Sequence, residues 1–177
     1  MAIHLREFQY SDTLAVNALA VSAFEQYRER YTDWPEFVEK IGNMAALSRS
    51  GEIIVAEADG EIVGAVAYIG LSAPKASFFD PSWPIMRMLV VSPKARGAGV
   101  GRALAEECLS RALRDKAEVF ALHTSPIMLV ALPMYERMGF RFLRDAPAIH
   151  GVPYGIYVKS LNPTSRSNRS RVERPPV

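Results

Sequence analysis

The sequence predicts one mixed α/β domain, and three observations lead to this prediction. Segments with the two-residue alternation of strands take turns with segments whose apolar residues recur at helical spacing. With 49% hydrophobic and 23% charged residues, the 177-residue chain can bury a sizeable core but is too short for two ordinary domains. The composition changes after Leu161, so we expect a single domain over 1–161 and a separate tail over 162–177.

The first part of the chain predicts a strand, two helices and a hairpin. Ser11 or Asp12 precedes the first helix as an N-cap, and Asp33 with Pro35 begins the second, because these residue types suit the free N–H groups of a first turn. Asp59-Gly60 predicts a type I′ turn in the hairpin, since both residues tolerate the positive φ that it needs. The predicted elements are a strand at 3–8, helices from 11 or 12 to about 28 and from 33–35 to before 51, and strands at 53–57 and 62–69.

After a loop at 74–84, the chain alternates between strands and helices. Apolar runs bounded by turn residues predict the strands, and the last helix is expected to end with Gly139 as its C′ residue. The single cysteine, Cys108, shares a helical stripe with Leu104 and Ala112, so we interpret it as a core residue and not as a nucleophile. The predicted elements are strands at 85–91, 119–124, 140–143 and 154–161, and helices at 100–116 and 128–138.

A glycine-rich loop joins the strand at 85–91 to the helix that follows it. Gly97, Gly99 and Gly101 lack a Cβ, so backbone N–H groups can approach an anion at the positive end of the helix dipole. A diphosphate fits this description best. The loop differs from a dinucleotide fingerprint, which needs a third glycine where this chain has Arg102, and from a P-loop, because no Gly-Lys-Ser/Thr follows.

Two motifs resemble the hallmarks of the GNAT superfamily of acyl-CoA-dependent N-acetyltransferases. The first is the Arg-x-x-Gly-x-Gly of Arg96, Gly99 and Gly101, preceded by Leu-Val-Val-Ser-Pro at 89–93. The second is Leu-Pro-Met-Tyr-Glu-Arg-Met-Gly-Phe at 132–140. They follow the family's order, and the resemblance covers roughly residues 1–160. It implies a GNAT-like fold, in which a central, mostly antiparallel sheet of about seven strands has helices on both faces.

The resemblance also implies acetyl-CoA as the cofactor. Leu89 and Val91 would offer main-chain groups to the pantetheine arm, and one of their N–H groups would stabilise the oxyanion. Ala131 matches a small residue that lets CoA approach the last helix, and Ser125 is a candidate cap for that helix. Relatives often place an asparagine where this chain has Met128, so contacts on that side are expected to differ. The diphosphate would be held by Arg96, Gly97, Ala98, Gly99, Val100, Gly101 and Arg102.

The implied reaction is N-acetylation of a primary amine, which attacks acetyl-CoA directly in a ternary complex. Tyr135 matches the family's motif tyrosine, and a phenol with a reference pKa of ~10 can protonate a thiolate whose acid has a pKa of ~8.5. His123 matches a position where certain relatives carry a glutamate base, and its unperturbed pKa of ~6.5 suits proton acceptance near neutral pH. A structural histidine, with Asp80, Glu25 or a water chain as the base, remains the competing interpretation. No metal is expected.

The acceptor is expected to bind between the first two helices and the loop at 74–84. Asp80 would bind an ammonium group, as could Glu25 or Glu29. The aromatic walls would come from Phe24, Tyr27, Tyr31, Trp34, Phe78, Phe79 and Trp83. An aromatic stripe at helical spacing is often simply core. Such a cleft suits a small primary amine, an amino acid or a peptide N-terminus equally well.

The net charge of +2 misrepresents the folded part. The tail carries four arginines and one glutamate, which contribute +3, so the remainder sums to about −1. The tail is rich in Ser, Pro, Asn and Arg, a composition typical of disorder, and it lacks the interleaved aromatics of a nucleic-acid-binding segment. No apolar run approaches the ~20 residues of a membrane span and no signal segment is visible, so we expect a cytoplasmic protein with no membrane partner. A homodimer is left open.

Two other functions remain open at this stage. A non-catalytic acyl-CoA-binding module would lack turnover, and it is suggested by the absence of a strand glutamate at 85–88 and of the asparagine at Met128. A nucleic-acid-associated protein acting through the tail would show salt-sensitive binding that is lost on deletion of 162–177.

Overall fold

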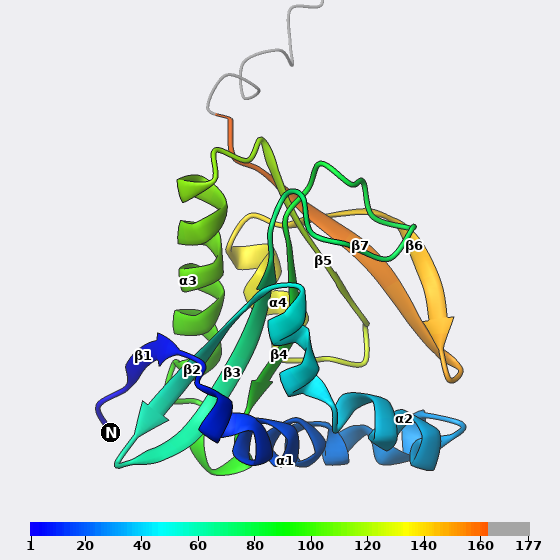
Figure 1. The fold of residues 1–177 in the computed structure, drawn as a ribbon. Helices are drawn as coiled ribbons and strands as arrows, with labels where there is room; N and C mark the ends of the chain where they lie inside the picture. Colours follow the sequence, from blue (N-terminus) through cyan, green and yellow to red (C-terminus); the bar gives the residue numbers. More distant parts are fainter. Residues whose placement is uncertain (163–177) are drawn as a thin grey trace, which may run out of the picture.

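The computed structural model describes residues 1–162 as a seven-stranded sheet with the strand order β1-β2-β3-β4-β5-β7-β6 (Figure 1). Neighbouring strands are antiparallel except β4 and β5, so the predicted mixed α/β fold with a mostly antiparallel sheet is confirmed. Apart from Asn162, the expected tail at 162–177 lies outside the described residues. Within the described part, no helix has the length and apolar character to cross a bilayer.

The element bounds agree closely with the sequence over the central part of the chain. The strands are β1 (His4–Glu7), β2 (Glu52–Ala58), β3 (Glu61–Ile69), β4 (Ile85–Val91), β5 (Val119–Thr124), β6 (Arg141–Ile149) and β7 (Val152–Ser160). The α-helices are α1 (Thr13–Phe24), α2 (Trp34–Ile41), α3 (Val100–Arg114) and α4 (Ala131–Arg137). Short 3₁₀ helices are η1 (Tyr10–Asp12), η2 (Glu25–Arg30), η3 (Met44–Arg49) and η4 (Pro93–Ala95).

Several local signals in the sequence have the predicted structural effect. Asp59 and Gly60 adopt φ values of 52° and 79°, as a type I′ turn requires. The Asp33 side chain caps α2 by accepting a hydrogen bond from the Glu36 N–H. Gly139 follows α4 with a φ of 96°, a conformation that favours glycine.

Two predicted caps are wrong. Asp12 precedes α1, but its carboxylate accepts from the Gln9 N–H at 2.8 Å and pairs with Arg6 instead of capping the helix. Ser125 does not cap α4, because residues 126–130 form turns and the helix begins only at Ala131; its hydroxyl accepts from the Ile127 N–H instead. Each side chain therefore accepts from a backbone N–H outside the helix that it was predicted to cap.

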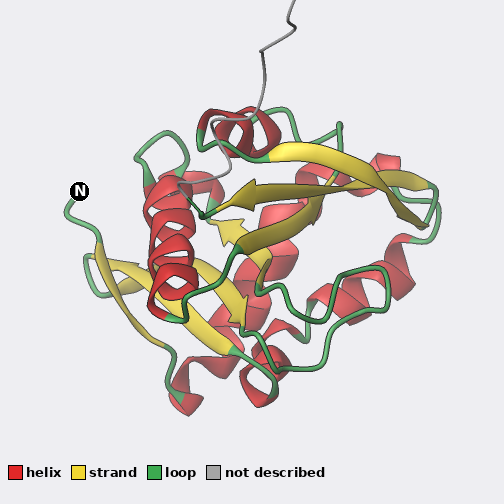
Figure 2. Ribbon diagram, turned by 90° about the horizontal axis from the view of Figure 1, so that it is seen from above, coloured by secondary structure: helices red, strands yellow, loops and turns green. Residues whose placement is uncertain are grey.

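The helices cover both faces of the sheet and enclose a core on each (Figure 2). On one face, Leu104 and Cys108 of α3 pack with Phe120 and Phe140; on the other, α1 packs through Val16 and its apolar neighbours. Cys108 is fully buried, which raises the pKa of its thiol, so the prediction of a core cysteine is confirmed.

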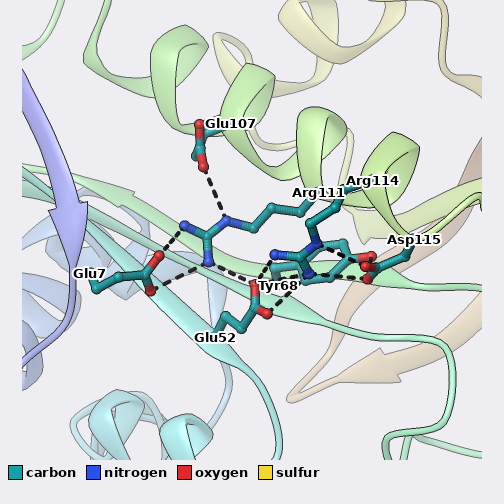
Figure 3. Close-up of polar contacts among 7 residues, drawn as sticks. All are labelled: Glu7, Glu52, Tyr68, Glu107, Arg111, Arg114 and Asp115. Atoms are coloured by element: carbon teal, nitrogen blue, oxygen red, sulfur yellow. Dashed lines mark hydrogen bonds and ion pairs between the residues drawn. The ribbon is translucent and has the colours of Figure 1, made fainter.

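An ion-pair cluster ties α3 to the β1 and β2 edge of the sheet (Figure 3). The buried Arg111 guanidinium bonds Glu52 at 2.7 Å and Glu107 at 3.1 Å and also pairs with Glu7. These contacts hold the pKa of Arg111 above its usual value although burial opposes them. Arg114, Asp115 and Tyr68 complete the cluster.

Candidate active site

The site begins where β4 and β5 separate. They pair only through Ile85 with Ala121 and Met86 with Leu122, and then diverge. β4 also contains a bulge, since its register against β3 shifts after Arg87. Met88, within this bulge, has a φ of 54°, which is costly for a side chain of this kind. Bulges of this type re-aim side chains and are frequent beside functional sites.

The end of β4 presents main-chain groups to the gap. The Ser92 N–H donates to the Val63 carbonyl at 2.8 Å, so Ser92 is hydrogen-bonded to β3. Because bonding sides alternate along an antiparallel strand, the polar groups of the preceding Val91 point away from β3, towards the side that β5 has left. Unpaired main-chain groups of this kind need a partner.

A cavity of about 260 Å³ lies at this gap and is lined by residues from both faces of the sheet. Leu122 and Tyr135 line it from the face covered by α3 and α4. Met44 lines it from the opposite face, and Phe24 and Phe37 line it from α1 and α2. Residues of β4 and β5 line the cavity between these two groups of side chains. Two molecules that approach from opposite faces of the sheet could therefore meet here.

The glycine-rich loop forms an open concave turn at the start of α3. Gly97 and Gly99 have φ values of 79° and 82°, and a Cβ placed on either would meet no heavy atom within 4 Å. Gly99 is the N-cap residue of α3. A Cβ on Gly101 would lie 3.5 Å from Val91 Cγ2 and 3.6 Å from Leu89 Cδ2. The structure therefore brings the loop, the first turn of α3 and the end of β4 together.

The other predicted cofactor residues surround this loop. Ala98 is exposed, and Val100 is buried beneath the first turn of α3. Arg102 pairs with Glu106 on the surface of α3. Arg96 donates to the Ala23 carbonyl near the end of α1 at 3.2 Å, and Ala131 is the first residue of α4.

Tyr135 lies on α4 with only 6% of its surface exposed and lines the cavity. Within the described residues its hydroxyl has no hydrogen bond; the ring meets Phe140 edge-on at 6.1 Å. Burial raises the pKa of this phenol, so it holds its proton throughout the neutral range. It can therefore serve as a proton donor.

His123 of β5 lines the same cavity and is enclosed by aromatic rings. The centroid of its ring lies 5.2 to 5.7 Å from the ring centroids of Phe78, Phe79 and Tyr154. Its buried Nδ1 has no hydrogen-bond partner among the described residues. Burial, and then the charge of Arg87, lower the pKa of His123 to about 4, below the unperturbed value expected from the sequence. The imidazole is therefore neutral at pH 7 and can accept a proton, although a low pKa weakens it as a base.

Of the predicted acceptor residues, Phe24 lines this cavity, whereas Tyr27, Tyr31, Phe79 and Asp80 do not. Tyr31 is buried, stacks on Phe37 at 3.9 Å and shares a 2.6 Å hydrogen bond with the Tyr154 hydroxyl. Tyr27 packs near α1, and Phe79 is buried against the ring of His123. Asp80 lies in a surface turn, where hydrogen bonds from Ser82 lower its pKa.

The acids proposed as alternative bases also lie elsewhere. Glu25 is on the exposed η2 and pairs with Arg28, and neither it nor Asp80 reaches the cavity. Two cationic side chains that were not predicted from the sequence, Arg87 and Lys40, do line the cavity. Arg87 had a visible signal, because it is the one charged residue in the apolar run of β4.

Residues 14–140 match the model of the acetyltransferase (GNAT) family. The chain belongs to the GNAT acetyltransferase family. None of the curated proteins matches it. The match spans both motifs and the gap between β4 and β5, so the resemblance expected from the sequence is confirmed.

Solved structures share the fold of this GNAT chain. A GNAT-family acetyltransferase from Staphylococcus aureus Mu50 is 18% identical, with a TM-score of 0.71 over 91% of this chain and 100% of that one. A ribosomal-protein-alanine N-acetyltransferase from Brucella melitensis is 20% identical, with a TM-score of 0.65 over 89% of this chain and 99% of that one. A protein from Corynebacterium glutamicum described as "histone acetyltransferase HPA2 and related acetyltransferase" is 24% identical, with a TM-score of 0.68 over 93% of this chain and 99% of that one. At these identities the likeness establishes the GNAT fold alone.

Proposed function

We propose that this GNAT protein transfers the acetyl group of acetyl-CoA to a primary amine, by direct attack in a ternary complex. The observation that carries the proposal is the cavity between β4 and β5, which Tyr135 and His123 both line. A ternary mechanism needs donor and acceptor to meet without a covalent enzyme intermediate. A cavity lined by residues from both faces of the sheet supports such a meeting.

The residues at the gap fit acetyl-CoA. The turn at Gly97 and Gly99 leaves room for an anion at the N-terminus of α3, where free N–H groups and the helix dipole favour a diphosphate. The main-chain groups of Val91 face the side that a pantetheine arm would occupy. Arg96, Ala98, Val100, Gly101 and Arg102 complete the proposed diphosphate site, and Leu89 and Ala131 complete the pantetheine site.

Acetyl-CoA supplies its acetyl group as a thioester, and the chain supplies orientation and proton transfer. In the proposal, an N–H of Leu89 or Val91 donates to the acetyl oxygen, where negative charge develops. Tyr135 donates its proton to the departing sulfur, and His123 accepts a proton from the amine. Most of the side chains that line the cavity are apolar or aromatic, which in the proposal limits the water around the reacting groups.

The test is turnover of the purified full chain with acetyl-CoA and a panel of amines, amino acids and short peptides. Release of free thiol and a matching acetylated product in the mass spectrum would support the proposal. Tight binding of acetyl-CoA without turnover on any acceptor would favour the alternative, a non-catalytic acyl-CoA-binding module. Absence of binding as well would reject both.

A further inference from the structure

We infer that Arg87 binds a carboxylate of the acceptor, so that the enzyme acetylates amines that also carry an acid group, such as amino acids. This inference rests on the proposed acetyl transfer and narrows its acceptor. Three observations carry it: the face of the sheet on which Arg87 lies, the charge of the cavity, and the absence of a partner for this guanidinium.

Arg87 belongs to the acceptor face of the gap. Along β4, Met86 and Leu89 pack with the core beneath α3, whereas Ile85, Met88 and Val90 pack with the core beneath α1. Arg87 follows Met86, so strand alternation directs it to the α1 face. The glycine-rich loop lies next to the first turn of α3, on the opposite side. Arg87 is therefore separate from the proposed diphosphate site.

The cavity is positively charged. Lys40 and Arg87 line it, and no described aspartate or glutamate does. Lys40 is already paired, with Glu36 at 2.7 Å. An acceptor that is a simple cationic amine would find no counter-charge in this cavity, whereas an anionic group would find one.

Arg87 has no carboxylate partner among the described residues. Within residues 1–162, no ion pair or hydrogen bond involves its side chain, whereas the guanidinium groups of Arg6, Arg111 and Arg114 pair with carboxylates. It is exposed to the cavity, yet the surrounding protein displaces enough water to lower its pKa, and no acid offsets this effect. A guanidinium in this situation offers a planar set of donors that matches a carboxylate.

The geometry of an amino acid suits this arrangement. Its amine and carboxylate are attached to one carbon, so a carboxylate on Arg87 would keep the amine inside the cavity that His123 and Tyr135 also line. The charge of Arg87 acts on the His123 ring, which places the two side chains within electrostatic range of each other. The apolar walls, with Met44, Phe24 and Phe37, fit an uncharged side chain.

The experiment compares matched acceptors that differ only in the carboxyl group. L-phenylalanine, L-methionine and L-leucine are assayed against their carboxamides, with kcat/KM expressed per neutral amine, for the parent, Arg87→Met, Arg87→Lys and Arg49→Met. Arg49 is an exposed arginine of η3 that does not line the cavity. In parallel, calorimetry with the same four proteins in the presence of CoA measures the binding of two product analogues, N-acetyl-L-phenylalanine and its carboxamide, N-acetyl-L-phenylalaninamide.

The parent and Arg49→Met should prefer the free acids by at least about tenfold, as expected for hydrogen bonds to a charged group. Arg87→Met should reduce this preference to less than about threefold, and Arg87→Lys should keep part of it. Equal use of acids and amides by the parent, or an unchanged preference in Arg87→Met, would overturn the inference. If no amine is acetylated, the proposed function fails, while the product-binding measurement still decides the role of Arg87: Arg87-dependent preference for the acid supports it, and equal binding rejects it.

Discussion

Replacement of Gly97 by valine tests whether the glycine-rich loop holds the diphosphate of acetyl-CoA. The chain offers a matched control, because Gly60 has the same φ of 79° and equally open surroundings but lies in the β2–β3 turn. A side chain at either position suffers the left-handed strain of about 1–2 kcal/mol. Only Gly97→Val also holds the anion away from the backbone N–H groups. The loss of one hydrogen bond to a charged group, ~1.5–3 kcal/mol, predicts binding weaker by about 10- to 150-fold.

The assay is calorimetric titration of acetyl-CoA into the parent, Gly97→Val and Gly60→Val, with thermal unfolding measured for each. Both variants should lose similar stability, because the strain is common to them. Only Gly97→Val should lose affinity. Equal affinities in all three proteins would refute the assignment of the diphosphate to this loop, and equal losses in both variants would attribute the effect to strain.

Two further predictions concern stability and pH. Arg111→Met removes the buried guanidinium at the centre of the ion-pair cluster in Figure 3. Its carboxylate partners are 35% to 65% exposed and can rehydrate, so we expect the free energy of unfolding to fall by about 1–2 kcal/mol, less than the ~3–5 kcal/mol of a fully buried pair. This loss corresponds to a melting temperature lower by roughly 2–8 °C. Arg102→Met, which removes an exposed pair on the same helix, should change stability by no more than about 0.5 kcal/mol, and equal effects in the two variants would contradict the role of the cluster. For His123, whose pKa is lowered to about 4, the imidazole stays neutral down to that pH, so kcat/KM per neutral amine should be level from pH 8 to about 5 and fall only near pH 4. His123→Ala should lower the plateau and abolish this limb; a parent limb near pH 6.5 would show that the environment of His123 differs from the one described.

Much of the fold was predictable because its signals are local. Asp59-Gly60, Asp33 and Gly139 each determine a turn or a helix end through their own backbone preferences. The strand expected at 140–143 was predicted too short, and the last strand begins two residues earlier than predicted. β6 is an exposed edge strand that contains Pro147 and polar residues, so it lacks the alternation that identifies a strand with one buried face.

The site was only partly predictable, because its acceptor side depends on contacts between distant segments. Tyr135 and His123 line one cavity, as a shared site requires. Tyr31 and Phe79, in contrast, are aromatic residues whose type and spacing would also suit the wall of a binding site, but both are buried in the core. Only the packing of distant segments distinguishes the two roles. Arg87 was overlooked although it is the one charged residue in the apolar run of β4, because the sequence does not show whether an acidic residue will lie beside it.

The most direct test of acetyl transfer at the gap is the effect of Tyr135→Phe on turnover, with Tyr157→Phe as the control. Both tyrosines are buried, but Tyr157 does not line the cavity. If Tyr135 protonates the departing sulfur, its variant should lose about 10²- to 10⁴-fold in kcat with nearly unchanged affinity for acetyl-CoA, because the ring still packs and only the hydroxyl is lost. Tyr157→Phe should keep the parental kcat. A decrease in kcat of less than about threefold in Tyr135→Phe, or equal decreases in the two variants, would contradict the assignment of Tyr135 as the acid.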